Sequence, residues 1–510
     1  MIRHLTLVSK GAVLTAVFSA VLAACAVGPD YSTPRSDLAP FHNRLAAAGV
    51  ADAAGAAARA SLDQWWTGFN DPMLAEVVQR ALDQNLDLAA SIARVQQARA
   101  AAASAGADLL PSGALDASAS YQRQSLRSPS GAAASSLPGY SRGIHDYSAG
   151  PAASWELDLF GGLRRTADAF KAEAQAAEAD HFGTRVIVAA DAADAYLQIR
   201  SYQARLAVAQ HQIDDDEHLL RLVRDRYAAG AATGREVAQA DALLKQARTS
   251  VPPLTIGLEQ QLNRLDVLMG VQPGTYAQQL GKERDIPSIP PVPADSEPSE
   301  MLRRRPDIIA AERRLAASSE RIGAAVSNYY PKFSLSAVLG FESAKAGKLF
   351  TSAAFQPAAQ AGLRWRLFDF GKVDAEVAQA KGGNAEALAL YRQSVLKAAQ
   401  DVEDSLTVLV QTQLRLNQVQ EQVDALVKSR DLSEQAYRSG SITLTDVLDA
   451  DRQLLNARDE LASSKANAAR AAVGVYRALG GGWSPATTVA ATDASTTATT
   501  AAGPASATTR

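Results

Sequence analysis

Two spacings of apolar residues alternate along this chain. In residues 162–229 and 372–439 apolar side chains recur every three or four positions, and no proline interrupts either stretch. Two sets recur at intervals of seven: Leu206, Ile213, Leu220 and Tyr227, and then Val402, Leu409, Leu416 and Val423. This periodicity predicts two long helices. At 1.5 Å per residue, each would be roughly 100 Å long, which is too long for a compact globular domain.

The spacing changes to two in residues 113–158 and again in residues 332–368. In the first stretch, an apolar series that starts at Leu115 alternates with a polar series that starts at Asp116. Such alternation predicts a β-hairpin with one apolar and one polar face in each stretch. Pro151 weakens the assignment of one strand, because proline donates no hydrogen bond to a strand ladder.

The chain contains an internal repeat. Residues 227–248 and 437–458 share nine identities at a constant offset of 210 positions. In both copies a helical pattern runs into a glycine, Gly230 or Gly440, and restarts at a threonine three residues later. A glycine stop followed by a capping residue is typical of the end of one helix and the start of another. The repeat therefore predicts two helical hairpins with equivalent tips.

These elements divide the chain into six parts. They are a targeting segment (1–24), an extended arm (25–70), a first repeat (71–270) with β-hairpin 113–158 and its helical tip near 230, a proline-rich crossover (271–298), a second repeat (299–483) with β-hairpin 332–368 and its tip near 440, and a low-complexity tail rich in alanine and threonine (484–510). The fold class we expect is mainly α with a small β part.

Residues 1–24 have the marks of a targeting segment, with positive residues followed by a short apolar run. The run ends in Leu22-Ala23-Ala24-Cys25, which resembles a bacterial lipobox and implies cleavage before Cys25 and acylation of that residue. Ala26, rather than aspartate, implies sorting to the outer membrane. An ordinary signal peptide and a spanning helix are the alternatives, although the run is short for a span.

Composition narrows the function classes. The net charge is −3 and the pI is about 6.1, so the chain has no basic footprint and nucleic acid is not an expected partner. Cys25 is the only cysteine, which excludes a disulfide framework and a cysteine-based metal site. Patterns of nucleotide-binding loops, metalloproteases and serine hydrolases are absent from the sequence. We therefore expect no enzyme activity, cofactor or metal.

The number of strands sets a physical requirement. Two hairpins supply four strands, which cannot close a barrel, and an open sheet edge does not occur in lipid. Membrane barrels begin at about eight strands of about 9–11 residues each. If these strands span a membrane, several copies must pool them, and three copies give twelve. A soluble half-buried sheet and a solid coiled coil are the alternatives that the pattern leaves open.

Several motifs together resemble an outer-membrane efflux protein, and more narrowly the lipoprotein branch of the TolC-type channels that serve RND pumps. They are WWTGFNDPML, WELDLFGG, RRRPDIIAAERRLAASSERIG, WRLFDFGK, QDVEDSL, DVLDADRQLLNAR and YRALGGGW, spread in order over residues 25–483. The resemblance implies a homotrimer with a twelve-stranded barrel in the outer-membrane lipid and an α-helical periplasmic tunnel. It also implies two partners, a periplasmic membrane-fusion adaptor and an inner-membrane RND pump.

The resemblance assigns a periplasmic gate to the hairpin tips. Asp446 and Asp449 match the carboxylates that ring the narrowest part of such channels, and they lie one turn apart on a helix. A ring of carboxylates attracts cations and repels anions. Some relatives carry an arginine where this chain has Ile442. We therefore hypothesise that Arg235 on the other hairpin pairs with Asp446 or Asp449.

Further tip residues follow from the same resemblance. Tyr437, Arg235 and Glu236 match positions that supply closing bonds between neighbouring hairpins. Gly230 and Gly440 match the positions where relatives dock the adaptor. Both glycines also have a purely structural reading as helix stops, which does not compete with docking.

Two other groups of residues are best explained by structural roles. The acidic run 214–217, with His211 and His218 nearby, is far better explained as a solvated helix face than as a metal site. Trp65, Trp66 and Trp483 are expected to pack around the middle of the tube.

The function predicted is a passive exit duct for small toxic molecules. A duct for a protein-secretion transporter and a structural periplasmic coiled-coil lipoprotein are the alternatives.

Overall fold

The computed structural model describes residues 26–34, 42, 62–291 and 304–484. The described residues fall into two compact units. One unit comprises residues up to 34, residues 95–177 and residues 311–391, and the other comprises residues 35–94, 178–310 and those from 392 onward. The predicted targeting segment with Cys25, most of the arm and the tail after 484 lie outside the described residues.

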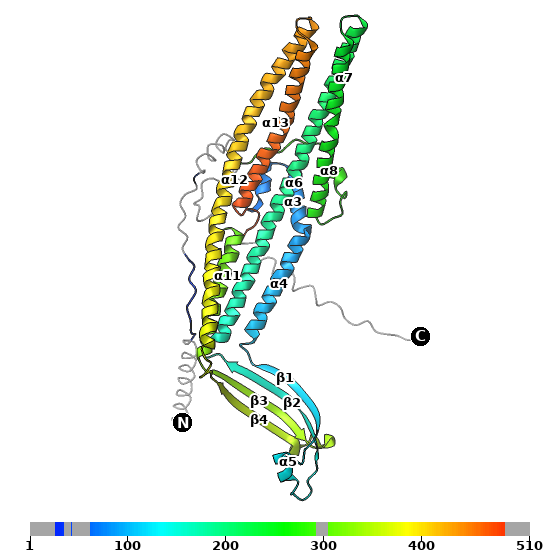
Figure 1. Ribbon diagram of the computed structural model, residues 1–510. Coiled ribbons are helices and arrows are strands. Elements are labelled where there is room, and N and C mark those ends of the chain that lie inside the picture. Colours follow the sequence, from blue (N-terminus) through cyan, green and yellow to red (C-terminus); the bar gives the residue numbers. More distant parts are fainter. Residues whose placement is uncertain (1–25, 35–41, 43–61, 292–303, 485–510) are drawn as a thin grey trace, which may run out of the picture. The chain divides into compact units, whose positions relative to one another are not determined.

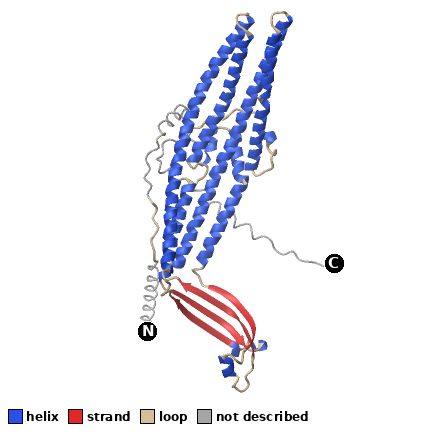
Figure 2. Cartoon of the chain, viewed as in Figure 1, coloured by secondary structure: helices blue, strands red, loops and turns tan. Residues whose placement is uncertain are grey.

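The first unit contains every strand of the described chain (Figures 1 and 2). The strands are β1 (Ser112–Arg123), β2 (Gly143–Leu157), β3 (Lys332–Ser343) and β4 (Phe355–Arg364). Short helices lie in and before the connections: α5 (Pro129–Ala134), η2 (Ser327–Tyr329), η3 (Ala346–Lys348) and η4 (Ser352–Ala354). The two predicted hairpins thus join into one antiparallel sheet in the order β1-β2-β3-β4.

The sheet has no covered face in the single chain. All twelve residues of β1 are exposed, and Leu115 retains 79% of its accessible surface. Pro151 lies inside β2, paired with Leu115 of β1, and the ladder between β2 and β3 is interrupted at residues 150 and 151. The strand therefore forms despite its proline, and the pairing with β3 is broken at the proline, as expected for a residue that donates no hydrogen bond.

Helices make up the rest of the described chain. Those that contribute to both units or to the second unit are η1 (Leu62–Phe69), α3 (Pro72–Gln84), α4 (Leu86–Ala107), α6 (Gly162–Ala228), α7 (Gly234–Thr249), α8 (Val251–Leu268), α9 (Ala277–Leu280), α11 (Pro306–Val326), α12 (Lys372–Arg438) and α13 (Leu444–Ala478). Helices α6 and α12 have 67 residues each, which confirms the two long helices that the periodicity predicts.

Three local features add to the elements that the sequence predicts. The return segment after the first tip is divided, because α7 ends at Thr249 and α8 begins at Val251, just before Pro252 and Pro253. The end of the arm forms η1, which buries Trp65, Trp66 and Phe69. The loop between β1 and β2 contains the helix α5, which Ser128 caps.

Aromatic packing in the second unit follows the prediction for the tryptophans. The ring of Trp65 stacks on Tyr476 with the centroids 5.4 Å apart, and Trp483 stacks on Phe182 at 4.7 Å. Asp71 caps α3 by accepting a hydrogen bond from the backbone N–H of Met73 at 2.8 Å. These contacts hold η1 and α3 in place and confirm a packing role for the tryptophans.

The N-terminal residues of the first unit form a strap over its helices. The backbone N–H of Val27 donates to the carbonyl of Phe160 at 3.2 Å. The guanidinium of Arg165 binds Asp30 and Glu320, each at 2.8 Å. A Cβ on Gly28 would lie 2.5 Å from the Cα of Gly323, so the close approach of the two backbones requires glycine there.

Candidate functional site at the hairpin tips

The two helical hairpins of the second unit end in equivalent turns (Figure 1). Gly230 and Gly440 both adopt positive φ, +72° and +77°, a left-handed conformation that favours glycine. In both turns the glycine N–H donates to the carbonyl of the tyrosine three residues earlier, at 3.0 Å. Nothing lies within 4 Å of a Cβ built on either glycine, so both tips face open space in the single chain.

Both returning helices start with the same reciprocal cap. At α7, Glu236 accepts from the N–H of Thr233, and the Thr233 hydroxyl accepts from the N–H of Glu236. At α13, Asp446 accepts from the N–H of Thr443 at 3.0 Å in the corresponding box. These caps satisfy donors that the helix leaves unpaired.

The caps determine the electrostatics of two predicted gate residues. The backbone N–H and the hydroxyl of Thr233 hold the pKa of Glu236 below its usual value. The hydroxyl and the N–H of Thr443 do the same for the pKa of Asp446. Asp449, one turn further along α13, binds Arg452 of its own helix. All three acids therefore have structural partners within their own hairpin.

Tyr437 and Arg235 have opposite environments. Tyr437 retains only 3% of its accessible surface, and the guanidinium of Arg226 from α6 lies 4.6 Å from its ring centroid. Arg226 also donates to the Tyr437 carbonyl at 3.2 Å, so the two hairpins are bonded to each other here. Arg235 is exposed. Within the described part of the single chain, no ion pair joins it to Asp446 or Asp449.

A hydrophobic core joins the two hairpins below their tips. It takes residues from all four helices: Ile213, Leu219, Leu220 and Val223 of α6, Ala240, Leu244 and Ala247 of α7, Tyr437 of α12, and Leu444 and Val447 of α13. The predicted gate residues thus lie on hairpins that pack together within one chain.

Three charged residues that lie beside this core were not identified from the sequence. Asp216 of α6 is buried, so the expectation that run 214–217 is a solvated helix face was wrong at this position. Asp451 of α13 is also buried, and its Oδ1 accepts a bond from Nε of Arg430 at 3.0 Å. The signal for Asp216 was its spacing, since it lies three residues after Ile213 and four before Leu220 in the heptad series.

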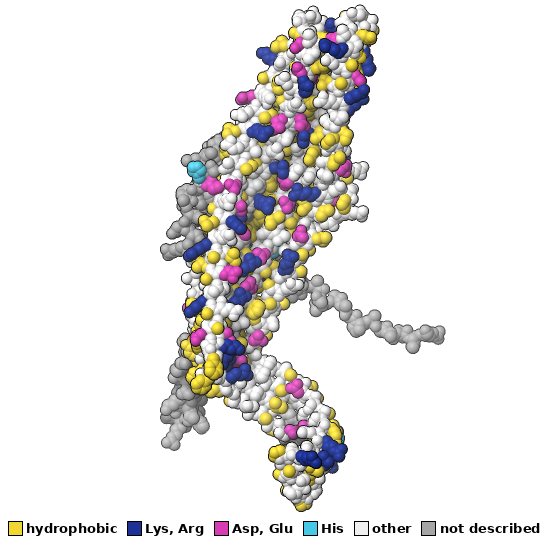
Figure 3. Space-filling view, viewed as in Figure 1, with side chains coloured by type: hydrophobic (Ala, Val, Ile, Leu, Met, Phe, Trp, Pro, Cys, Tyr) yellow, Lys and Arg dark blue, Asp and Glu magenta, His cyan; other side chains and the backbone are white. Residues whose placement is uncertain are grey.

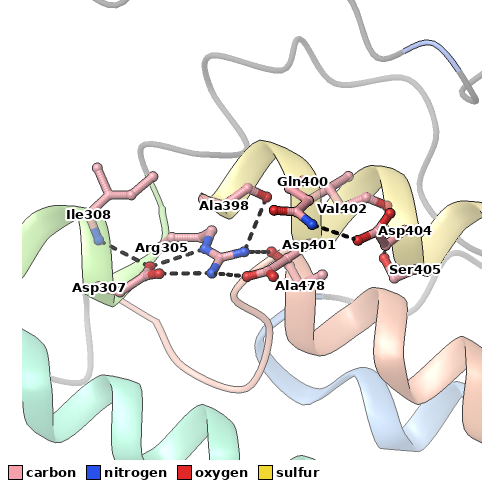
Figure 4. A network of polar contacts seen from close by, with 10 residues as sticks. All are labelled: Arg305, Asp307, Ile308, Ala398, Gln400, Asp401, Val402, Asp404, Ser405 and Ala478. Carbon is pink, nitrogen blue, oxygen red and sulfur yellow. Dashed lines mark hydrogen bonds and ion pairs between the residues drawn. The ribbon is translucent and has the colours of Figure 1, made fainter. Parts of the chain in front are cut away.

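The run RRRPDI, which belongs to one of the motifs named above, has a structural role in the second unit. Figure 4 shows the Arg305 guanidinium between the carboxylates of Asp307 and Asp401, each 2.8 Å away, and it also donates to the carbonyl of Ala478 at 2.9 Å. These bonds tie the start of α11 to α12 and α13. A cleft of about 760 Å³ opens beside them, lined by both acidic and basic side chains.

Neither a metal site nor a membrane-spanning helix is found in the part of the chain that the structure describes. No group of three or more His, Cys, Asp or Glu side chains there is arranged to hold a metal ion. No described helix is both long and apolar enough to cross a bilayer. On the face in Figure 3, acidic and basic side chains are interspersed over the helices.

Long helical hairpins with capped tips, together with an antiparallel sheet that is exposed on both faces, define the class of TolC-type outer-membrane channels. The chain belongs to the outer membrane efflux protein family, whose model matches residues 77–271 and 298–481. This membership confirms the resemblance that the motifs indicate and the mainly α fold. The chain is an efflux channel of the outer membrane.

Curated and solved relatives match along most of their length. The pyoverdine export outer membrane protein OpmQ of Pseudomonas aeruginosa is 34% identical over 447 residues, covering 87% of this chain and 91% of the relative. The toluene efflux pump outer membrane protein TtgC of Pseudomonas putida is 30% identical, covering 93% and 96%. The solved outer-membrane channel OprN is 33% identical with a TM-score of 0.81, covering 90% of this chain and all of that chain.

Proposed function

We propose that three copies of this chain form one passive exit duct, with their sheets pooled into a twelve-stranded barrel and their helices into a periplasmic tunnel. The observation that supports this most is the sheet. Strands β1 and β4 each have a partner on one side only within the described chain, and both faces of β1 are exposed. Because lipid tolerates no open sheet edge, further copies must complete the wall.

The internal repeat indicates which helical surfaces the copies share. Arg226 of α6 contacts Tyr437 of α12 within one chain. At the offset of 210, these positions correspond to Ala436 and Tyr227. Tyr227 retains 54% of its surface in the single chain. If the hairpins alternate around a ring, Tyr227 of one copy faces Ala436 of the next, which buries this aromatic side chain.

The strap supports a lipid anchor at Cys25. Ala26 lies beside Gly161, since a Cβ on that glycine would be 3.1 Å from the Ala26 Cα. Gly161 falls between the end of β2 and the start of α6, next to the sheet that we place in the membrane. Acylation of Cys25 would therefore attach lipid at the membrane boundary. Release of labelled palmitate from the wild type but not from Cys25→Ala tests this.

The gate remains at the tips in this proposal. Asp446 and Asp449 of three copies form a carboxylate ring, and Arg235 is available to pair with an acid of a neighbouring copy because it forms no ion pair with Asp446 or Asp449 among the described residues of its own chain. Tyr437 and Glu236 keep the hairpins in the closed arrangement. Single-channel conductance of Arg235→Ala is expected to rise. A conductance equal to that of the wild type removes the pairing from the account.

The open space around Gly230 and Gly440 supports docking of the periplasmic adaptor, which links the duct to an inner-membrane RND pump. Gly440→Arg places a long charged side chain at the tip and is expected to abolish capture of the adaptor. Gly440→Asn is the control, because asparagine tolerates the left-handed conformation. Equal capture by both variants would exclude this docking position.

The relatives support small molecules as cargo, since the names of two of them specify pyoverdine export and toluene efflux. The direct test of the duct is a planar bilayer. Purified protein is expected to produce discrete current steps. A protein that extracts as a folded complex yet never conducts would instead be a structural lipoprotein.

A further inference from the structure

Asp216 occupies an unusual position on α6. It retains 2% of its accessible surface, and it lies in the same helix as the core residues Ile213 and Leu220. Its Oδ1 accepts a bond from Nε2 of Gln212 at 2.7 Å. Its Oδ2 is buried and has no hydrogen-bond partner among the described residues. A buried carboxylate oxygen without a partner is costly when it is ionised.

The charged groups around Asp216 come mainly from the other hairpin. Asp451 of α13 and Arg430 of α12 act on it across the contact, and Asp215 acts from its own helix. Arg430 is already engaged, because it binds Asp451 at 3.0 Å and Glu434 at 2.8 Å.

Helix α7, which also packs here, places Leu244 and Ala247 in the core. Its nearby cation, Arg248, binds Glu217 at 2.7 Å. The surroundings therefore hold several carboxylates and two arginines that bind other acids, and no cation among the described residues forms an ion pair with Asp216.

The internal repeat shows that packing alone does not require an acid at this position. At the offset of 210, the residue that corresponds to Asp216 is Leu426, which packs in a hydrophobic cluster of the other hairpin. A leucine side chain therefore suits the equivalent place on the equivalent helix. The carboxylate costs stability as an anion, because its buried Oδ2 accepts no hydrogen bond from the described residues, and protonation removes this unpaired charge.

We infer that Asp216 is a proton-binding site between the two hairpins, and that the proton bound there holds the hairpins together. Opening the tips separates α6 from Arg430 and Asp451, which admits water to the carboxylate and lets it ionise. The inference rests on the proposed function, since it makes the gate sensitive to acid on the periplasmic side.

The electrostatics give the direction of the effect. Burial raises the pKa of Asp216 to about 6, and the neighbouring carboxylates add to this shift. In water an aspartate has a pKa of about 4, so the closed arrangement binds the proton more tightly than the open one. Acid therefore favours the closed state as the pH falls through 6. Between pH 7.5 and pH 5 the closed-to-open ratio should rise about ten-fold.

The test is the open probability of the purified full-length channel in a planar bilayer between pH 7.5 and pH 5. We expect the wild type to close about ten-fold on acidification. Asp216→Asn keeps the shape and a donor without the charge, so it should stay predominantly closed and lose this pH response. Asp214→Asn is the matched control, because Asp214 is an exposed acid on the same helix, and it should respond as the wild type does.

A second measurement needs no conduction. Infrared spectra of the detergent-solubilised protein should show the carbonyl band of a protonated carboxylic acid that titrates near pH 6 and is absent from Asp216→Asn. Current steps in every variant with the same pH response in Asp216→Asn would overturn the inference while the duct stands. Absence of current in all variants would overturn the duct, and the infrared titration would still decide the proton site.

Discussion

The two helical hairpins carry the same motif in opposite environments. Tyr227 and Tyr437 are equivalent in the repeat, yet Tyr227 is 54% exposed and Tyr437 is 3% exposed. The aspartates that follow differ in the same way. The side chain of Asp241 is 34% exposed, whereas that of Asp451 is 6% exposed. On the second hairpin, Arg226 of the first hairpin lies over the Tyr437 ring, whereas Asp451 binds Arg430 of its own hairpin and is acted on by Asp215 of the first.

The duplication gives both hairpins the same residues but not the same neighbours. Each hairpin has one surface that contains its copy of the repeated tyrosine and aspartate, which are Tyr227 and Asp241 in the first hairpin and Tyr437 and Asp451 in the second. In the second hairpin, that surface meets the first hairpin of the same chain. In the first hairpin, the same surface has no counterpart within the chain, and we assign it to the next copy. The tips, by contrast, are equivalent in both hairpins, because their caps depend only on residues within one turn.

The largest effect should come from Arg430→Ala. It leaves the buried Asp451 carboxylate without its cation, and breaking a buried pair in this way costs about 3–5 kcal/mol. The matched change in the other hairpin is Lys245→Ala, which removes a solvent-exposed partner of Asp241. Thermal unfolding should show a strong destabilisation only for Arg430→Ala. Equal effects would mean that the two environments do not differ as described.

Tyr437→Ala should rank next. Truncating a buried aromatic ring costs about 3 kcal/mol, so the contact between the hairpins should weaken and the melting temperature should fall. Tyr227→Ala should leave the fold of each chain intact and instead weaken the association of copies, measured by sedimentation in detergent. Tyr437→Phe sharpens the comparison, because the Tyr437 hydroxyl has no partner among the described residues and its loss should be nearly neutral.

The caps should respond equally. Thr233→Ala and Thr443→Ala each remove one reciprocal cap, and each should cost about 1 kcal/mol. Amide hydrogen exchange in the first turns of α7 and α13 measures both effects locally. A cost confined to one tip would contradict the equivalence of the two turns.

The smallest effect is the pH dependence of the same caps. Because hydrogen bonds from the threonines depress the folded-state pKa of Glu236 and of Asp446, their contribution is present at neutral pH. It is lost as the pH falls through those depressed values. The protection factors at both tips, which correct for the intrinsic slowing of amide exchange in acid, should therefore fall to a similar, modest extent. Glu236→Gln and Asp446→Asn should remove this fall in protection at their own tips.

Local features were predictable from the sequence and distant contacts were not. The glycine stops at Gly230 and Gly440 and the caps at Thr233 and Thr443 depend on neighbouring residues, so a pattern over a few positions reveals them. The strands followed from alternation, although alternation could not show that both faces of β1 remain exposed in one chain.

The rest of the site depends on segments far apart in the chain. Asp216 is buried by contacts with residues more than 200 positions away, and the acidic run around it favoured a solvated face. The heptad spacing contained the opposite signal. The gate pairing of Arg235 stays a prediction, because it requires a neighbouring copy.

The central claim is that identical copies complete one another, and cross-linking tests it directly. In the variant Tyr227→Cys with Ala436→Cys, mild oxidation should join separate chains, and non-reducing gels should show covalent species of two and three chains. The equivalent pair, Arg226→Cys with Tyr437→Cys, should link within one chain and leave its mass unchanged. If the first pair also yields only single-chain material from the native membrane, the shared wall does not exist as proposed.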